Sequence, residues 1–152
     1  MFRGITCINL DEKSRMILPT RYRDSVRVHA ANQLVATIDT EEHCLLLYPL
    51  PEWEDIQQKI EALSSFNRTT RRIQRLLIGH ATDLNVDGNG RILLPQALRE
   101  YANITRKIIL VGQGKKFEIW DEEYWLKQRN SWLEQSTDNV EEMPEELRSL
   151  SL

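Results

Sequence analysis

The 152-residue sequence predicts an α+β protein, mainly β, that is built from two tandem copies of one β-β-α-β-β unit. The main observation is an internal repeat. Residues 11–19 read Asp-Glu-Lys-Ser-Arg-Met-Ile-Leu-Pro, and residues 87–95, displaced by 76 positions, read Asp-Gly-Asn-Gly-Arg-Ile-Leu-Leu-Pro. The echo continues with Arg23 against Arg99 and, after a four-residue slip, Trp53 against Trp125. A unit of ~50 residues is too small to bury a good core alone, so we expect the two copies to share one.

Each copy predicts the same order of elements. Alternating, β-branched residues predict a first strand, and a turn leads into a short second strand. That strand ends at a proline, which cannot donate to a ladder and suits the first turn of a helix. Two further apolar runs predict a closing hairpin. The expected strands are 5–10, 15–18, 34–38 and 44–48 around a helix at 20–28, and then 81–86, 91–94, 107–111 and 117–120 around a helix at 96–102.

Helical patterns lie between the copies and after the second one. Pro51 suits an opening turn, and apolar residues then recur at helical spacing until residues 64–67 break the pattern. A second helix is predicted at 69–78, ending at Gly79, and a third at 122–132. The expected organisation is a first unit at 1–53, connecting helices at 54–79, a second unit at 80–125, and a C-terminal helix with an acidic flexible tail at 126–152.

Composition restricts the class of protein. Hydrophobic residues make up 41% and charged residues 28%, which excludes a fully disordered chain. The longest apolar runs are far too short to cross a bilayer, and the first residues lack the pattern of a signal peptide. Cys7 and Cys44 each lie in an apolar run without a CxxC partner, which favours buried free thiols over a metal site or a disulfide. We therefore expect a soluble cytoplasmic protein.

The net charge of −3 hides an uneven distribution of charge. Residues 134–152 hold six acids and one base; without them, 17 of the 23 acids and 19 of the 20 bases remain in residues 1–133. Local clusters of bases decide whether a protein can contact phosphates, so the overall charge does not exclude nucleic acid as a partner. The clearest such cluster lies on the second predicted helix and consists of Arg68, Arg71, Arg72 and Arg75.

The repeated turn combines an aspartate with an arginine four residues later. We expect Asp11 and Asp87 to accept hydrogen bonds from turn amides, a structural role, while Gly88 and Gly90 suit the positive φ that such turns use. An exposed Asp–Arg pair alone contributes only ~0–1 kcal/mol. The aspartate can, however, aim the guanidinium without using all five of its donors, which leaves a fork for phosphate or a guanine edge.

Many motifs in order carry a resemblance to a known family. They are Phe2-Arg3-Gly4, Asp11-x-Lys-x-Arg15, Leu18-Pro-Thr-Arg-Tyr-Arg23, Pro51-Glu-Trp53, Arg71-Arg72 and Asp87-Gly88-x-Gly90-Arg91. Over about residues 1–130 the sequence resembles the MraZ family of bacterial transcriptional regulators. This resemblance implies a duplicated swapped-hairpin fold of the SpoVT/AbrB-like type, forming a pseudo-twofold barrel and assembling into a homo-oligomeric ring.

The resemblance also implies a function. The ring would bind double-stranded DNA at short direct repeats in the promoter of the division and cell-wall gene cluster, usually as a repressor associated with the nucleoid. DNA contact transfers to Lys13, Arg15 and Arg91, and to the nearby Arg3. No catalytic residue, cofactor, metal, membrane or small-molecule substrate is implied.

Two other functions stay open at this point. Asp11 and Asp87 could converge around a metal ion as a nuclease site, although turn chemistry explains each of them. An antitoxin-like module of the same fold could bind a protein through its C-terminal segment.

The helical arginine cluster could be a second phosphate stripe, although a solvated face is the commoner meaning of such a run. The three histidines lack metal-ligand spacing, and the repeated aromatic positions favour core or subunit-interface packing over base stacking.

Overall fold

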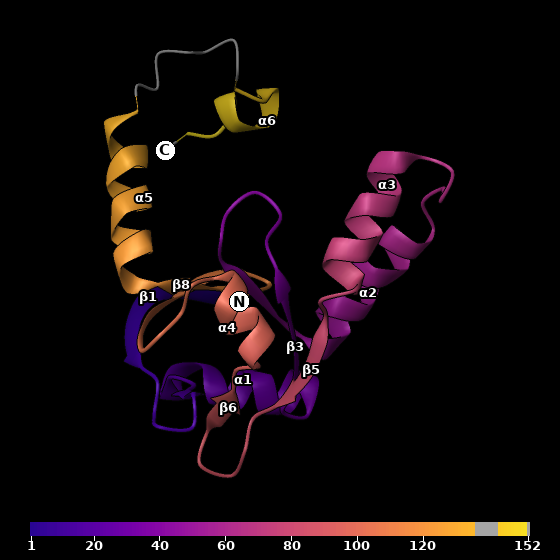
Figure 1. The fold of residues 1–152 in the computed structure, drawn as a ribbon. Coiled ribbons are helices and arrows are strands. Elements are labelled where there is room, and N and C mark those ends of the chain that lie inside the picture. The colour runs from indigo at the N-terminus through magenta and orange to yellow at the C-terminus, as the bar shows by residue number, and fades with distance from the viewer. Residues whose placement is uncertain (136–142, 152) are drawn as a thin grey trace. The chain divides into compact units, whose positions relative to one another are not determined.

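The computed structural model describes residues 1–135 and 143–151, which divide into two compact units, Met1–Glu122 and Glu123–Leu152 (Figure 1). The strands, all in the first unit, are β1 (Phe2–Asn9), β2 (Arg15–Ile17), β3 (Gln33–Ile38), β4 (Leu45–Pro49), β5 (Thr82–Asn85), β6 (Arg91–Leu93), β7 (Lys107–Gly114) and β8 (Phe117–Asp121). The helices are α1 (Thr20–Ala30), α2 (Leu50–Glu61), α3 (Arg68–Ile73), the π-helical turn η1 (Gln74–Ile78), α4 (Gln96–Tyr101), α5 (Glu122–Glu134) and α6 (Glu145–Arg148). Every helix and strand expected from the repeat is present, with ends shifted by a few residues.

The two repeats exchange their first strands. β1 pairs antiparallel with β7 of the second repeat, and β5 pairs antiparallel with β3 of the first. The six-stranded sheet therefore has the palindromic order β1-β7-β8-β4-β3-β5, in which each strand of one repeat has its equivalent at the mirrored position. This order confirms the duplicated α+β fold and the swapped hairpins. Equivalent side chains repeat the symmetry: Nε of Arg23 donates to the carbonyl of Leu18 at 2.7 Å, and Nε of Arg99 donates to the carbonyl of Leu94 at 3.0 Å.

The second strands of the two repeats form a ladder of their own. β2 and β6 pair antiparallel, with Met16 opposite Ile92 at the centre, where both side chains are completely buried. The six-stranded sheet and this two-stranded ladder enclose the main core, to which α1 and α4 also contribute. The strands thus form two sheets where the sequence predicted a barrel, and the main core lies between these sheets.

A second core lies where the connecting helices pack on the sheet. Val35, Leu46, Tyr48 and Trp53 are buried there against residues of α2 and η1. The hydroxyl of Thr37, a fully buried polar side chain, donates to the carbonyl of Leu77 at 2.7 Å and so ties η1 to β3. Of the repeated aromatic positions, Tyr48 and Trp53 belong to this core, as expected for packing rather than base stacking.

Some details of the first unit differ from the sequence-based expectations. The expected helix at 69–78 is interrupted, because the chain changes from α-helical to π-helical winding at Gln74. Cys44 is buried as expected, but the prediction of a buried thiol at Cys7 is wrong. Phe2 and Ile8 face the core from β1, and the strand's period of two places Cys7 on the other face. There its Sγ donates to Oε2 of Glu122 at 2.8 Å, and this hydrogen bond is the largest cause of the raised pKa of Cys7.

The second unit holds the end of the chain. Most of α5 belongs to it, and Trp125 meets Trp132 there edge to face, with ring centroids 5.9 Å apart. Of the segment expected to be an acidic flexible tail, residues 136–142 and 152 lie outside the described residues, while Glu145–Arg148 form the short helix α6.

Candidate nucleic-acid interface

The first repeated loop is organised by one carboxylate. Oδ1 of Asp11 accepts hydrogen bonds from the backbone amides of Lys13 and Arg15, both at 2.9 Å. Oδ2 accepts from Nε of Arg15 at 2.7 Å. The backbone closes the same turn, because the amide of Asp11 donates to the carbonyl of Arg15 at 3.0 Å. One side chain therefore shapes the turn and orients the arginine that follows it.

The second loop repeats this arrangement atom for atom. Oδ1 of Asp87 accepts from the amides of Asn89 and Arg91 at 2.8 and 2.9 Å, and Oδ2 accepts from Nε of Arg91 at 3.1 Å. Ser14 and Gly90, which are equivalent by the repeat, have the positive φ values of 61° and 76° that the turn requires. The structural role expected for the two aspartates is what the geometry shows.

These hydrogen bonds keep both carboxylates ionised. The pKa of Asp11 lies below its ordinary value chiefly because the Arg15 amide donates to the carboxylate. Desolvation opposes this shift, and the Arg15 side chain and the Lys13 amide add to it. The pKa of Asp87 is lowered for the same reasons by Arg91, with the amide of Asn89 contributing as well. Each arginine therefore keeps a charged partner at neutral pH.

The guanidinium groups keep most of their donors. Within residues 1–135 and 143–151, the hydrogen bonds of the Arg15 and Arg91 side chains are those from Nε to the aspartates. The side chains of Arg15 and Arg91 are 26% and 32% exposed, and Lys13 and Asn89 are exposed at the tips. The terminal nitrogens of both arginines are thus available to a ligand, which is the condition that the sequence-based hypothesis required.

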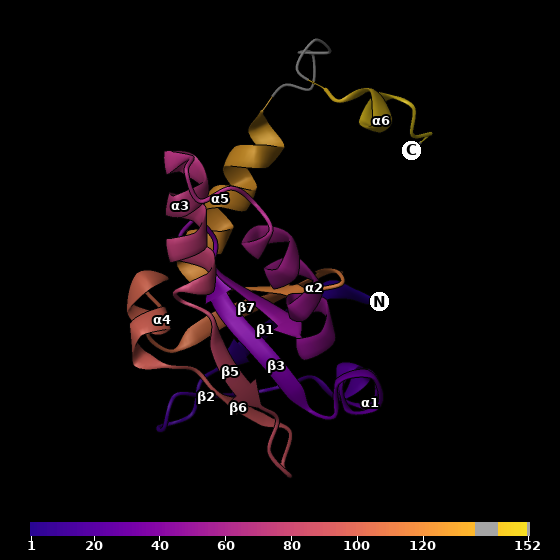
Figure 2. The same ribbon diagram turned by 90° about the vertical axis from the view of Figure 1, so that its right-hand side faces the viewer.

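Both loops lie on the same side of the first unit, at the lower edge of Figures 1 and 2. Two exchanged hydrogen bonds hold them there. The amide of Leu18 donates to the carbonyl of Gly90 at 2.7 Å, and the amide of Leu94 donates to the carbonyl of Ser14 at 3.1 Å. Each loop is therefore tied to the strand that follows the other loop. Lys13, proposed together with the two arginines from sequence, lies on the same side.

The outer face of the ladder between the loops contains two residues that sequence reasoning did not single out. Arg15 lies opposite Leu93, and Ile17 lies opposite Arg91. Because opposite and alternate residues share one face of a ladder, these four side chains form a single surface, away from the buried Met16 and Ile92. Successive side chains of a strand point to opposite faces, so the sequence could have placed Ile17 on the same face as Arg15, and Leu93 on the same face as Arg91.

The two glycines of the second loop have different roles. Gly88 has open space where a Cβ would lie. Gly90 is buried, and a Cβ there would lie 2.5 Å from Nε of Arg23, the side chain that holds the carbonyl of Leu18. The sequence predicted a positive φ at both glycines, but of the two only Gly90 has one, and its Cβ direction faces Arg23.

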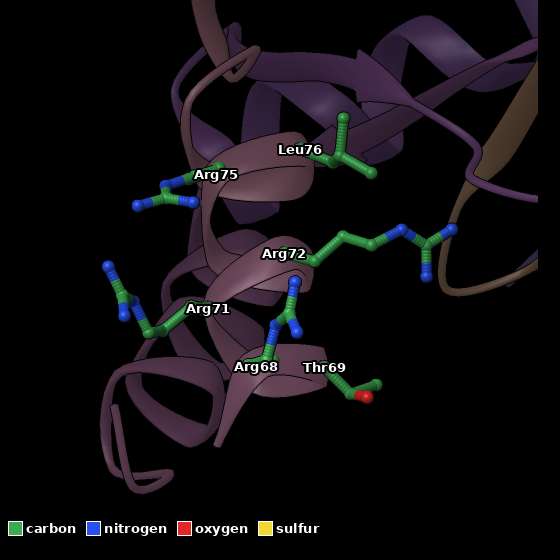
Figure 3. Close-up of a pocket in the computed structure, with 6 residues that line it drawn as sticks. All are labelled: Arg68, Thr69, Arg71, Arg72, Arg75 and Leu76. Atoms are coloured by element: carbon green, nitrogen blue, oxygen red, sulfur yellow. The ribbon is translucent and has the colours of Figure 1, made fainter. Parts of the chain in front are cut away.

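Two groups of basic residues lie away from the loops. Arg3 stands near the start of β1, six residues before its end at Asn9, which is roughly 20 Å of extended strand. The four helical arginines are exposed and line a cavity of about 670 Å³ on α3 and η1 (Figure 3). Figure 3 shows Arg71 and Arg75 extending to one side and Arg72 to the other. In both ribbon views α3 is at the opposite end of the first unit from the loops.

A metal site at the aspartates finds little support. The oxygens of Asp11 and Asp87 accept hydrogen bonds within their own loops, and no group of three or more His, Cys, Asp or Glu residues suited to a metal ion occurs in the described part of the chain. His29 and His43 are exposed and His80 is half-buried. Of the helices that the structure describes, none has the length and apolarity needed to span a membrane.

Comparison with known proteins identifies the family. A family model described as "MraZ protein, putative antitoxin-like" matches residues 1–76 and 77–145. Three proteins named "Transcriptional regulator MraZ" align over all 152 residues and over their own full length, with 53% identity in Alkalilimnicola ehrlichii, 52% in Coxiella burnetii and 49% in Halorhodospira halophila. The chain belongs to the MraZ family. The two matched segments each contain one Asp-x-x-x-Arg loop, so the MraZ unit is the repeat found in the sequence.

The lowered pKa values of this MraZ chain predict a pH dependence of the loops. A carboxyl whose folded pKa is depressed stabilises the fold fully above the ordinary aspartate pKa and loses that contribution as the pH falls through the folded pKa. Carbon-detected NMR titration should therefore place the Asp11 and Asp87 inflections below that of aspartate in an unstructured peptide. Inflections at or above the peptide value would contradict the loop geometry.

Gly90 should be far more sensitive to substitution than Gly88. Gly90→Ala combines a positive φ of 76° with a close approach to Arg23, so it should lower the free energy of unfolding by about 1–3 kcal/mol. Gly88→Ala, in open space, is the matched control and should change it by less than about 0.5 kcal/mol. Urea denaturation at one fixed protein concentration measures both, and equal effects would refute the assigned roles.

Proposed function

We propose that this chain is a sequence-specific, DNA-binding transcriptional regulator that acts as a repressor. The observation that carries the proposal is the pair of half-buried arginines on one side of the unit, each with its Nε hydrogen-bonded to an aspartate and its terminal nitrogens not used in hydrogen bonds to the described residues. The relatives that match the whole chain are named transcriptional regulators, which supports the same function.

The loop chemistry suits a DNA duplex. An arginine held at Nε keeps both terminal amino groups in one plane, and this fork can donate to O6 and N7 of a guanine or to two phosphate oxygens. A bidentate contact to guanine discriminates against the wrong base by about 1–3 kcal/mol. Arg15 and Arg91 are therefore the proposed base readers. Lys13, an exposed cation at the first tip, is the proposed phosphate contact.

One chain presents too few cations for tight binding. Each neutralised phosphate changes the slope of log affinity against log salt by only about 0.9, so useful affinity needs several loops acting together. A homo-oligomeric ring would supply them at fixed spacing, and short direct repeats in the DNA would match that spacing. The family resemblance supports the promoter of the bacterial division and cell-wall gene cluster as the target. The protein would then act in the cytoplasm, at the nucleoid, without a cofactor and without catalysis.

A second function is favoured by one observation. The matching family model carries an antitoxin-like description, and residues 134–152 hold six acids and one base. An acidic segment of this kind suits a basic protein partner. This role is compatible with DNA binding through the loops, because the acidic residues follow the last strand, β8, and lie far along the chain from both loops.

Arg15→Ala should abolish specific DNA binding without unfolding the protein. Arg15 lies at a loop on the outer face of the ladder, and its side-chain hydrogen bond is to Asp11, so its loss should spare the core while lowering affinity for the operator at least about tenfold. Fluorescence anisotropy with the direct repeats upstream of the gene, together with a thermal melt, measures both effects. Arg75→Ala is the matched control, because it removes an exposed arginine at the other end of the unit and should leave affinity unchanged within about twofold.

Two outcomes would overturn the assignment. Wild-type affinity in Arg15→Ala for the native repeats would exclude the loops as readers. Cleavage of labelled DNA on addition of Mg²⁺ or Mn²⁺, lost in Asp11→Asn, would favour the nuclease hypothesis instead.

A further inference from the structure

On the outer face of the β2–β6 ladder, cationic and apolar side chains alternate both along each strand and across the pair. Ile17 is 48% exposed and Leu93 is 56% exposed, and they are equivalent positions of the two repeats. Each lies opposite one arginine across the ladder and two residues from the other arginine along its own strand. No described residue buries either aliphatic side chain in the monomer.

The register of the ladder fixes the face on which Ile17 and Leu93 lie. Met16 and Ile92 are completely buried on the inner face, so a shift by one residue would place both arginines in the core. Ile17 and Leu93 must therefore face outward with Arg15 and Arg91. Exposed aliphatic residues on a short strand pair invite association, and a partner that covers them would also have to accept the two guanidinium groups.

We propose that Ile17 and Leu93 contact thymine methyl groups in the DNA major groove and so select thymine beside the bases that Arg15 and Arg91 read. This inference rests on the proposed function and adds two specificity-determining residues to it. The major groove, about 12 Å wide, admits a two-stranded β-ribbon, and the thymine methyl is the apolar group that it presents. The occupant is thus a duplex that offers polar base edges and methyl groups side by side.

The spacing on the ladder agrees with the spacing of stacked bases. Residues that face each other across an antiparallel pair have Cβ atoms about 5 Å apart, and alternate residues on one strand are about 7 Å apart. Base pairs rise by about 3.4 Å. An aliphatic side chain beside a guanine-bound arginine therefore falls one or two base pairs away, within reach of the methyl group there.

Hydrogen-bonding capacity favours DNA over a second copy of the chain as the occupant. Two ladders packed face to face would bring four guanidinium groups together, and their terminal N–H donors would find no acceptors among the arginine and aliphatic side chains of the facing ladder. The ion pairs of the described residues on this face are those of Arg15 with Asp11 and Arg91 with Asp87, which leave a net donor surface. Phosphates and guanine acceptors provide the complementary surface that a second ladder lacks.

The test removes the methyl groups from the DNA and the aliphatic groups from the protein. A duplex that the full-length protein enriches from a random library serves as the probe, and its thymines are replaced one at a time by deoxyuridine. For the wild-type protein, substitution at one or two positions beside a guanine should weaken binding about fourfold, which corresponds to about 0.8 kcal/mol for a methyl-sized group returned to water.

Double-mutant comparison makes the contact specific. Ile17→Ala should bind the thymine duplex about fourfold more weakly and show no further loss at one of these deoxyuridine positions, and Leu93→Ala should do the same at another. Ile5→Ala, which shortens a 56% exposed aliphatic side chain on β1, is the matched control and should keep the full sensitivity to deoxyuridine.

The outcomes separate this inference from the proposed function. Enrichment of a specific duplex, with equal sensitivity to deoxyuridine in all four proteins, would overturn the thymine contact and leave DNA recognition in place. A change of oligomer size in Ile17→Ala or Leu93→Ala, seen by light scattering and without loss of methyl sensitivity, would assign the face to self-association. Failure to enrich any duplex would overturn both proposals.

Discussion

The exchange of strands between the two repeats is the constraint on which the rest of this structure depends. Because β1 completes the hairpin of the second repeat and β5 completes that of the first, neither repeat has a full sheet by itself. The same exchange joins β2 to β6 and links the carbonyls of Gly90 and Ser14 to amides of the opposite repeat. The two arginine loops are consequently parts of one rigid frame. Two tips on a fixed frame can meet one duplex with little loss of conformational entropy on binding.

The loops show how symmetry of the fold can coexist with asymmetry of the surface. Both use an aspartate in the same way, yet the first tip carries Lys13 where the second carries Asn89. Because Glu12 offsets Lys13, the two loops have the same net charge, but one tip carries charged side chains and the other small, polar ones. A surface of this kind has a direction along the DNA, which fits the proposed recognition of direct repeats better than recognition of a palindrome.

The cationic residues also show where sequence patterns mislead. By composition the strongest basic cluster is the arginine run of α3 and η1, whereas the loops show a single repeated arginine each. Folding places that run at the far end of the unit from the loops and leaves it without an ion pair to any described acid. The run of arginines along the chain thus identified a basic surface. The two isolated arginines of the loops form the better candidate for contact with bases, because the fold places them on one side of the unit. The aspartate partner, four residues away, was the informative signal.

The sequence by itself determined the duplication, the order of helices and strands, and the Asp-x-x-x-Arg turns, because each depends on contacts within a few residues. The hydrogen bonds of Asp11 to Lys13 and Arg15 are local, so a short pattern was sufficient to predict them. Only the tertiary structure decided which strand pairs with which, since β1 and β7 are joined by contacts across about a hundred residues and several apolar strands compete as partners. It also decided that Cys7 faces outward and that Ile17 and Leu93 lie beside the arginines, because those positions follow from the register between the repeats.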